Sequence, residues 1–118
     1  MIQAVPVDER KYLWEGSDPV FHVSLFELAG GSWSEDSWEL SGCGVLDAMA
    51  WAQEMVAPRG AWALGLVSTV RIPGTEEVQV GFTYLEGYDL NADRSDLSPW
   101  ERDQFDAMLR RRSPDQGD

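Results

Sequence analysis

Residues 61–85 constrain the fold most, because they predict a β-hairpin around which the rest of the chain must pack. The first arm of this hairpin is apolar at both alternating positions, as is typical of a strand covered on both faces. The second arm alternates between an apolar set, Val78, Val80, Phe82 and Tyr84, and a polar set, Glu77, Gln79, Gly81 and Thr83. We expect the apolar set to face the core and Pro73-Gly74 to form the turn.

Four shorter segments before the hairpin also favour strands. Residues 2–7 form an expected edge strand, because Pro6 lacks the backbone donor that a central strand needs. Residues 11–14 and residues 37–40 are further short candidates, and residues 20–28 alternate more regularly. Residues 29–32 (Ala-Gly-Gly-Ser) are expected to form a flexible loop.

Two helices are predicted. Residues 44–57 carry an apolar stripe at helical spacing and stop at Pro58 and Gly60. The stripe consists of Val45, Met49, Ala52 and Val56. The second helix begins with Ser98 as N-cap, Pro99 at its first position and Glu101 completing a capping box. Its apolar edge is Phe105, Met108 and Leu109, and arginines at 110–112 suit its carboxyl end.

These elements predict an α+β fold with an antiparallel sheet of four to five strands and two helices, in the order β-β-β-α-β-β-α. We expect the first helix to pack across the sheet and the second to cap its end. Residues 1–112 are expected to form a single domain, because 118 residues suit one core, and residues 113–118 a flexible tail.

One pattern within the chain resembles a known group of proteins. It comprises Glu39-Leu40-Ser41, Val45 and Leu46, residues 49–54 (Met-Ala-Trp-Ala-Gln-Glu) and the strand at 62–67. It resembles small actinobacterial proteins of uncharacterised function, which implies a bacterial source. The resemblance covers about half of the chain and implies no activity, substrate or site residue.

The charge balance restricts the partners of the protein. Asp and Glu number 21 against 9 Lys and Arg, which gives a formal net charge of −12. Nucleic acid and anionic membrane surfaces are therefore unexpected partners, because both require basic patches. The charge favours solubility and electrostatic steering toward a basic protein.

Catalytic groups are few. His22 is the only histidine and Cys43 the only cysteine, so neither a zinc site nor a disulfide framework is expected. A structural histidine and an inert buried thiol are the ordinary alternatives to a chemical role for these two residues. We expect no enzyme activity and no cofactor. The single cysteine, the lack of a signal-peptide pattern and the lack of a membrane-length apolar run favour the cytoplasm.

The acidic stretch at 89–96 has a partial calcium-loop spacing. Asp89, Asn91, Asp93 and Ser95 occupy alternate positions before a helix, as calcium ligands do. Arg94 and Trp100, however, stand where the motif requires Gly and Glu. A loop of Asx turns is the alternative interpretation.

The residues predicted to bind a partner form two acidic patches. The first lies in the expected loop at 30–38 and the second in the acidic stretch: Trp33, Glu35, Asp36 and Trp38, then Asp89, Asp93 and Asp96. Exposed tryptophans among carboxylates are typical of a surface for a basic partner, although both indoles could instead cover a small core. The preferred hypothesis is a non-enzymatic acidic interaction domain, with an immunity- or inhibitor-type role as its specific version. A small-molecule or metal-binding accessory protein is the alternative, and both a monomer and a homodimer remain open.

Overall fold

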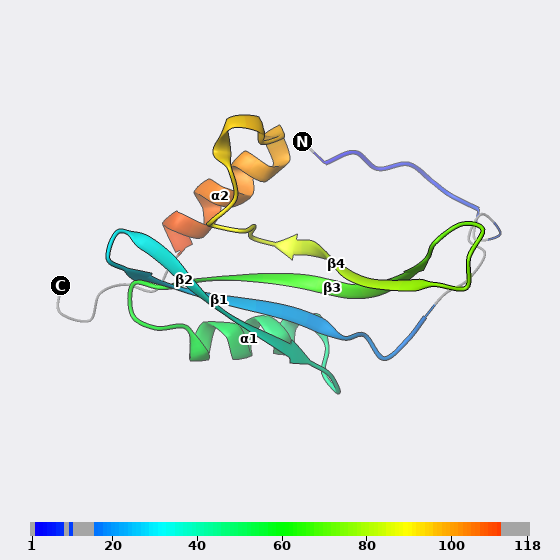
Figure 1. Ribbon diagram of the computed structural model, residues 1–118, viewed down its shortest axis with the longest axis horizontal. Coiled ribbons are helices and arrows are strands. Elements are labelled where there is room, and N and C mark those ends of the chain that lie inside the picture. The colour runs from blue at the N-terminus through cyan, green and yellow to red at the C-terminus, as the bar shows by residue number, and fades with distance from the viewer. Residues whose placement is uncertain (1, 9, 11–15, 112–118) are drawn as a thin grey trace.

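The computed structural model describes residues 2–8, 10 and 16–111, which form a four-stranded antiparallel sheet with one helix on each face (Figure 1). The elements are β1 (Phe21–Ala29), β2 (Ser32–Leu40), α1 (Val45–Met55), β3 (Ala61–Arg71), β4 (Val78–Glu86), the 3-10 turn η2 (Arg94–Asp96) and α2 (Pro99–Arg111). The strands lie in the order β2-β1-β3-β4. The predicted α+β class is confirmed.

Strand β2 is longer than the sequence predicted. Gly30 and Gly31 have φ angles of +60° and +86°, and Ala29 pairs with Ser32, so two glycines make a tight hairpin turn. Residues 32–38, which were expected in a loop, pair with β1 along their whole length. The loop prediction is wrong here because the glycines bring a polar segment directly against an apolar strand.

Two cores lie on opposite faces of the sheet. The core under α1 consists of Phe21, Val23, Ala48, Ala52, Val56, Trp62 and Leu64. The core under α2 consists of Phe26, Ala61, Ala63, Leu90, Phe105 and Met108. Strands β1 and β3 contribute to both, which confirms that the first half of β3 is covered on both sides.

Helix α1 is fixed by contacts at its start and in its last turns. The backbone N–H of Gly44 donates to Asp47 Oδ2 at 3.2 Å. The indole N–H of Trp62 on β3 donates to Gln53 Oε1 at 3.0 Å, which ties the helix to the sheet. The predicted stripe is partly wrong: Ala48 is fully buried, whereas Val45 is 41% exposed.

Helix α2 has the predicted capping box. Ser98 N donates to Glu101 Oε1 at 2.7 Å, and Glu101 N donates to Ser98 Oγ at 3.1 Å. Its position was predicted wrongly, because it packs Phe105 and Met108 on the face opposite α1 and does not cap the end of the sheet. Figure 1 shows the two helices on opposite sides of the strands.

The far part of the β3–β4 hairpin extends beyond both helices, and we call residues 68–81 the arm (Figure 1). Val78, Val80 and Phe82 were expected to face the core, but they are 51%, 69% and 38% exposed. An 11-residue helix is about 16 Å long, whereas an 11-residue strand spans about 36 Å. Helix α1 therefore covers only part of β3, and most side chains of the arm are exposed.

Of the predictions for the two ends of the chain, one is wrong and two concern residues outside the described part. Residues 2–8 form no strand, so the expected edge strand at 2–7 is wrong, and Ile2 and Val5 are 93% and 77% exposed. The expected strand at 11–14 and the expected tail at 113–118 lie outside the described residues. Neither α1 nor α2 is long and apolar enough to cross a membrane.

Candidate functional site

The first predicted patch is divided by the sheet. Trp33 and Glu35 pair with Leu28 and Phe26 on β1, so they point to the side of α2. Asp36 and Trp38 point to the side of α1, where the Trp38 ring meets the Trp51 ring edge to face at 5.7 Å. The four residues therefore do not form one surface, because successive side chains of a strand point to opposite faces.

The second patch is brought beside the first through one contact. Asn91 Nδ2 donates to the carbonyl oxygen of Trp33 at 3.1 Å, which attaches the loop after β4 to β2 across the α2 face. Asp89 lies in the same loop. Its carboxylate and that of Glu35 both raise the pKa of Tyr84, so the structure places these two predicted residues around one side chain.

The other acids of the loop have structural roles or lie apart. Asp93 accepts the N–H of Ser95 at 2.9 Å and caps η2, and this bond lowers its carboxyl pKa. Asp96 is exposed within η2. The Arg94 guanidinium lies over the Phe105 ring, 4.1 Å from its centre, so the loop also carries a cation.

The calcium spacing corresponds to two Asx turns in the structure. Asp89 Oδ1 accepts the N–H of Asn91 at 2.9 Å, and Asp93 does the same for Ser95. Within residues 16–111 and the short described N-terminal segments, no three His, Cys, Asp or Glu side chains come together as a metal site.

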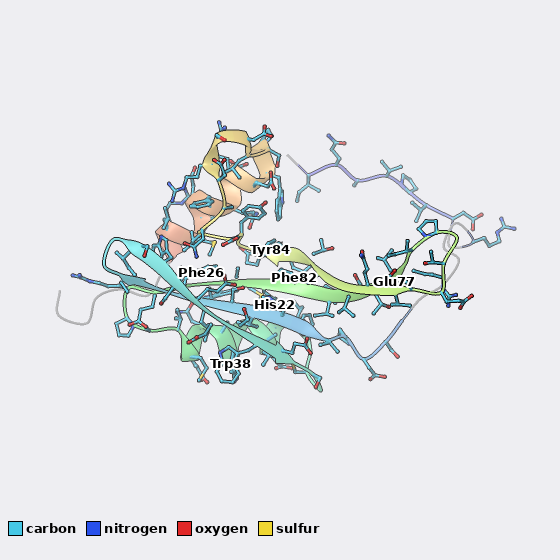
Figure 2. All side chains as sticks on the ribbon, in the orientation of Figure 1. His22, Phe26, Trp38, Glu77, Phe82 and Tyr84 are labelled. Carbon is cyan, nitrogen blue, oxygen red and sulfur yellow. The ribbon has the colours of Figure 1, made fainter. Side chains whose placement is uncertain are left out.

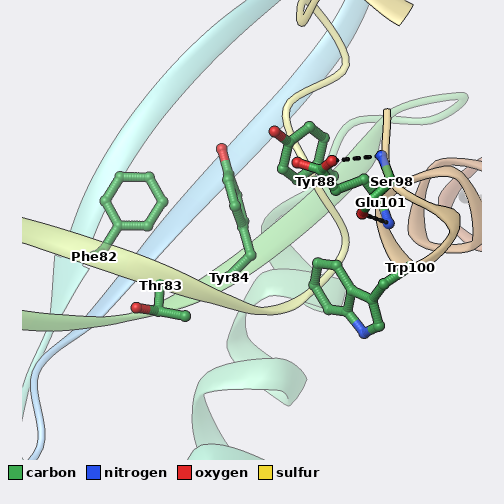
Figure 3. Close-up of a pocket in the computed structure, with 7 residues that line it drawn as sticks. All are labelled: Phe82, Thr83, Tyr84, Tyr88, Ser98, Trp100 and Glu101. Atoms are coloured by element: carbon green, nitrogen blue, oxygen red, sulfur yellow. Dashed lines mark hydrogen bonds between the residues drawn. The ribbon is translucent and has the colours of Figure 1, made fainter. Parts of the chain in front are cut away.

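A groove lies where β4 meets the start of α2, and we call it the aromatic groove (Figure 3). It has a volume of about 650 Å³ and is wide open to solvent. Seven residues line it: Phe82, Thr83, Tyr84, Tyr88, Ser98, Trp100 and Glu101. The Trp100 indole is 46% exposed, although tryptophan is usually well buried.

The aromatic rings form a continuous row on the α2 face. His22 stacks flat on Phe82 with ring centres 4.0 Å apart, and Phe82 meets Tyr84 edge to face at 5.0 Å. Tyr84 in turn contacts Tyr88, also at 5.0 Å. Figure 2 shows His22, Phe82 and Tyr84 close together over the middle of the sheet.

Carboxylates surround this row. Burial raises the pKa of Tyr84 most, and the charges of Asp89 and Glu35 raise it further. The Tyr88 hydroxyl donates to Glu101, which raises the Tyr88 pKa and lowers that of Glu101. The three acids come from β2, a loop and α2. Glu101 lines the groove, and Glu35 and Asp89 act on Tyr84, so negative charge at this end of the row favours a cation.

The two residues considered for chemistry lie in packed surroundings. His22 Nδ1 and the hydroxyl of nearby Ser24 are buried without a hydrogen-bond partner among the described residues. Cys43 is partly buried and packs against the α1 core.

Sequence reasoning missed the groove residues Tyr84, Tyr88, Trp100 and Glu101. Tyr84 was assigned to a core face and Glu101 to a helix cap, and each also has that second role in the structure. One signal could have drawn attention to the region: residues 78–85 carry no charge although acids flank them at 77 and 86.

Comparisons with protein families, curated proteins and solved structures found no match to this chain. The resemblance to small actinobacterial proteins therefore stays a prediction.

Proposed function

We propose that the protein is a non-enzymatic interaction domain that binds a basic segment of a partner protein in the aromatic groove. The observation that carries this proposal is the open groove in which Tyr84, Tyr88 and Trp100 lie beside the carboxylate of Glu101. Glu35 and Asp89 are close enough to Tyr84 for their charges to raise its pKa. The proposal keeps Trp33 and Glu35 with Asp89 on the binding side, and it leaves Asp36 and Trp38 on the other face.

The chemistry of the groove suits a lysine or arginine side chain. Aromatic faces attract cations, and this attraction strengthens where water is partly excluded. Carboxylates at the rim add a charge-assisted contact for the same cation. The net charge of −12 adds long-range attraction, which speeds the approach of a basic partner.

An immunity- or inhibitor-type role, in which the domain neutralises a basic toxin or nuclease, is the specific version of this proposal. We place that role in the cytoplasm on the grounds of the sequence pattern.

A small-molecule accessory role is the second candidate. A groove volume of about 650 Å³ falls within the range of small-ligand sites. The groove is open to solvent, however, which suits a chain segment better than an enclosed ligand.

A pair of charge-matched variants tests the proposal. Asp89→Asn with Glu101→Gln removes two charges at the groove, whereas Asp36→Asn with Glu54→Gln removes two exposed charges elsewhere. Binding of a lysine-rich peptide is measured by calorimetry at low and at high salt. We expect the groove pair to weaken binding about tenfold and the control pair to weaken it less than about threefold.

Equal effects of the two pairs would mean that net charge alone attracts the peptide and would refute the groove as the site. Affinity capture from lysate of the source organism, eluted with salt, then identifies the natural partner. A stoichiometric basic protein that the groove variant no longer captures is the expected result.

A further inference from the structure

Strand β4 is an edge strand with an unusual surface. It lies last in the order β2-β1-β3-β4, and no further strand of the described chain pairs with its outer side. Residues 78–85 are uncharged and contain no proline. An exposed edge with these properties is a template for another strand, and natural proteins normally protect such edges.

The backbone groups that point outward can be assigned from the pairing. Ile72 N donates to Glu77 O at 2.9 Å, so this pair is hydrogen-bonded. Hydrogen-bonded and non-bonded pairs alternate along an antiparallel ladder, and the register is regular from Arg71–Val78 to Gly65–Tyr84. The N–H and C=O groups of Val78, Val80 and Phe82 therefore point away from β3.

The opposite edge of the same sheet differs. Strand β2 carries Glu35, Asp36 and Glu39, all exposed, within nine residues. Charges along an edge strand oppose the addition of another strand. The β2 edge has one strongly exposed apolar side chain, Trp38, among these charges, whereas β4 presents Val78, Val80 and Phe82 in a row with no charged residue between them.

We propose that the basic partner segment binds as an added antiparallel strand on the outer edge of β4. This inference rests on the proposed function and deepens it. The aromatic groove lies at the Tyr84 end of that edge, so a strand on the edge runs directly into it. One binding surface then offers backbone hydrogen bonds, an apolar strip and a site for a cation.

The geometry defines the sequence of the bound segment. In an antiparallel strand, the residue opposite Tyr84 comes first and carries the basic side chain into the groove. The residues two, four and six positions later lie beside Phe82, Val80 and Val78, on the same face, and are apolar.

Charge disfavours a second copy of this chain in the two-fold pairing centred on Val80, the middle one of the three outward-facing residues. A two-fold pairing centred on Val80 would place Glu76 and Glu77 of the second copy opposite Tyr84 and Thr83, beside Glu101. Like charges in such positions are repulsive. A basic segment has the opposite, favourable charge at the same place.

The test uses a synthetic peptide, Lys-Thr-Val-Thr-Val-Thr-Val, and a matched peptide with Glu in place of Lys. Amide hydrogen exchange of the protein is followed by NMR. We expect the Lys peptide to slow exchange at Val78, Val80 and Phe82 by at least about tenfold, because these amides become hydrogen-bonded. Gln79 and Gly81, which already bond to β3, should change little, and the Glu peptide should bind much more weakly.

Two substitutions of Val80 distinguish the contribution of its backbone N–H to peptide binding from that of its side chain. Val80→Pro removes the outward N–H without removing a bond to β3, and Val80→Thr keeps that N–H. We expect the proline variant to lose most of the peptide affinity and the threonine variant to retain it, with thermal denaturation confirming that both are folded.

The outcomes separate the two proposals. Binding of the Lys peptide that shifts groove signals without protecting the edge amides would refute strand addition and leave the groove function standing. Absence of binding by any lysine-containing peptide would refute both. Protection of the edge amides in the free protein would show that the edge is already occupied, by a second copy if it depends on concentration and by the chain itself if it does not.

Discussion

The imidazole of His22 lies flat on the phenyl ring of Phe82, with ring centres 4.0 Å apart and ring planes 10° apart. Gly65 makes this arrangement possible, because a Cβ atom there would lie 2.5 Å from Phe82 Cδ2. The stack therefore requires glycine at this position of β3. His22 and Phe82 form the end of the aromatic row opposite Tyr88.

Replacing Gly65 with alanine should destabilise the protein by about 1–3 kcal/mol, because Phe82 must move to admit the methyl group. Gly81→Ala on β4 is the matched control, since a methyl group added there would have no atom within 4 Å. The control should stay within about 0.5 kcal/mol of the parent. Chemical denaturation measures both, and equal effects would contradict the packing argument.

Replacing Ser24 with alanine should stabilise the protein. The Ser24 hydroxyl is fully buried and has no hydrogen-bond partner among the described residues. Removing an unpaired buried polar group gains about 1 kcal/mol. The free energy of unfolding tests this, and a loss of stability would mean that the hydroxyl is hydrogen-bonded in solution.

Tyr84 should ionise later than an ordinary tyrosine, because burial and the charges of Asp89 and Glu35 raise its pKa. A raised pKa in the folded state gives stability that is fully present below the unfolded pKa of about 10 and is lost as the pH rises above it. Absorbance at alkaline pH follows the phenolate, with Tyr84→Phe to assign the signal. Glu35→Gln with Asp89→Asn should lower the Tyr84 pKa, and an unchanged titration would place these acids too far away to act.

Trp38 and Trp100 are about equally exposed, at 47% and 46%, but should differ in role. Trp38→Ala removes the edge-to-face contact with Trp51 and should cost about 1–2 kcal/mol of stability with little effect on peptide binding. Trp100→Ala should cost less stability than Trp38→Ala, because no edge-to-face ring contact is lost, and it should weaken binding of the lysine peptide. Weaker peptide binding by the Trp38 variant and not by the Trp100 variant would place the binding surface on the α1 face.

Local signals in the sequence predicted several elements correctly. The Ser98–Glu101 capping box, the Pro73-Gly74 turn and the helix before Pro58 each depend on a few neighbouring residues, and each is present. Residues 37–40 of β2 were predicted as a short strand, but residues 32–36 were not, because they are mostly polar and only their pairing with β1 makes them a strand. The alternation of apolar and polar residues in β4 correctly predicted which side chains share a face. Whether a helix covers that face depends on the length of the helix, which the alternation does not show.

The site was predictable only in parts. Glu35 and Asp89 were chosen for their acidity, and both lie near Tyr84. Their convergence depends on contacts between residues more than fifty positions apart, such as the bond from Asn91 to Trp33. Trp33 and Trp38 point to opposite faces of the sheet because they lie in a strand, whereas the expected loop would have allowed both to lie on one surface.

The two cores have a consequence for how the strands align. Val23 and Leu25 on β1 pair with Leu64 and Trp62 of β3 on the side of one core, and Phe26 pairs with Ala61 on the side of the other. A slip of one residue would send every side chain to the wrong core at once. Both cores therefore specify the same register of β1 against β3, and a chain that forms one core correctly has already aligned the strands for the other.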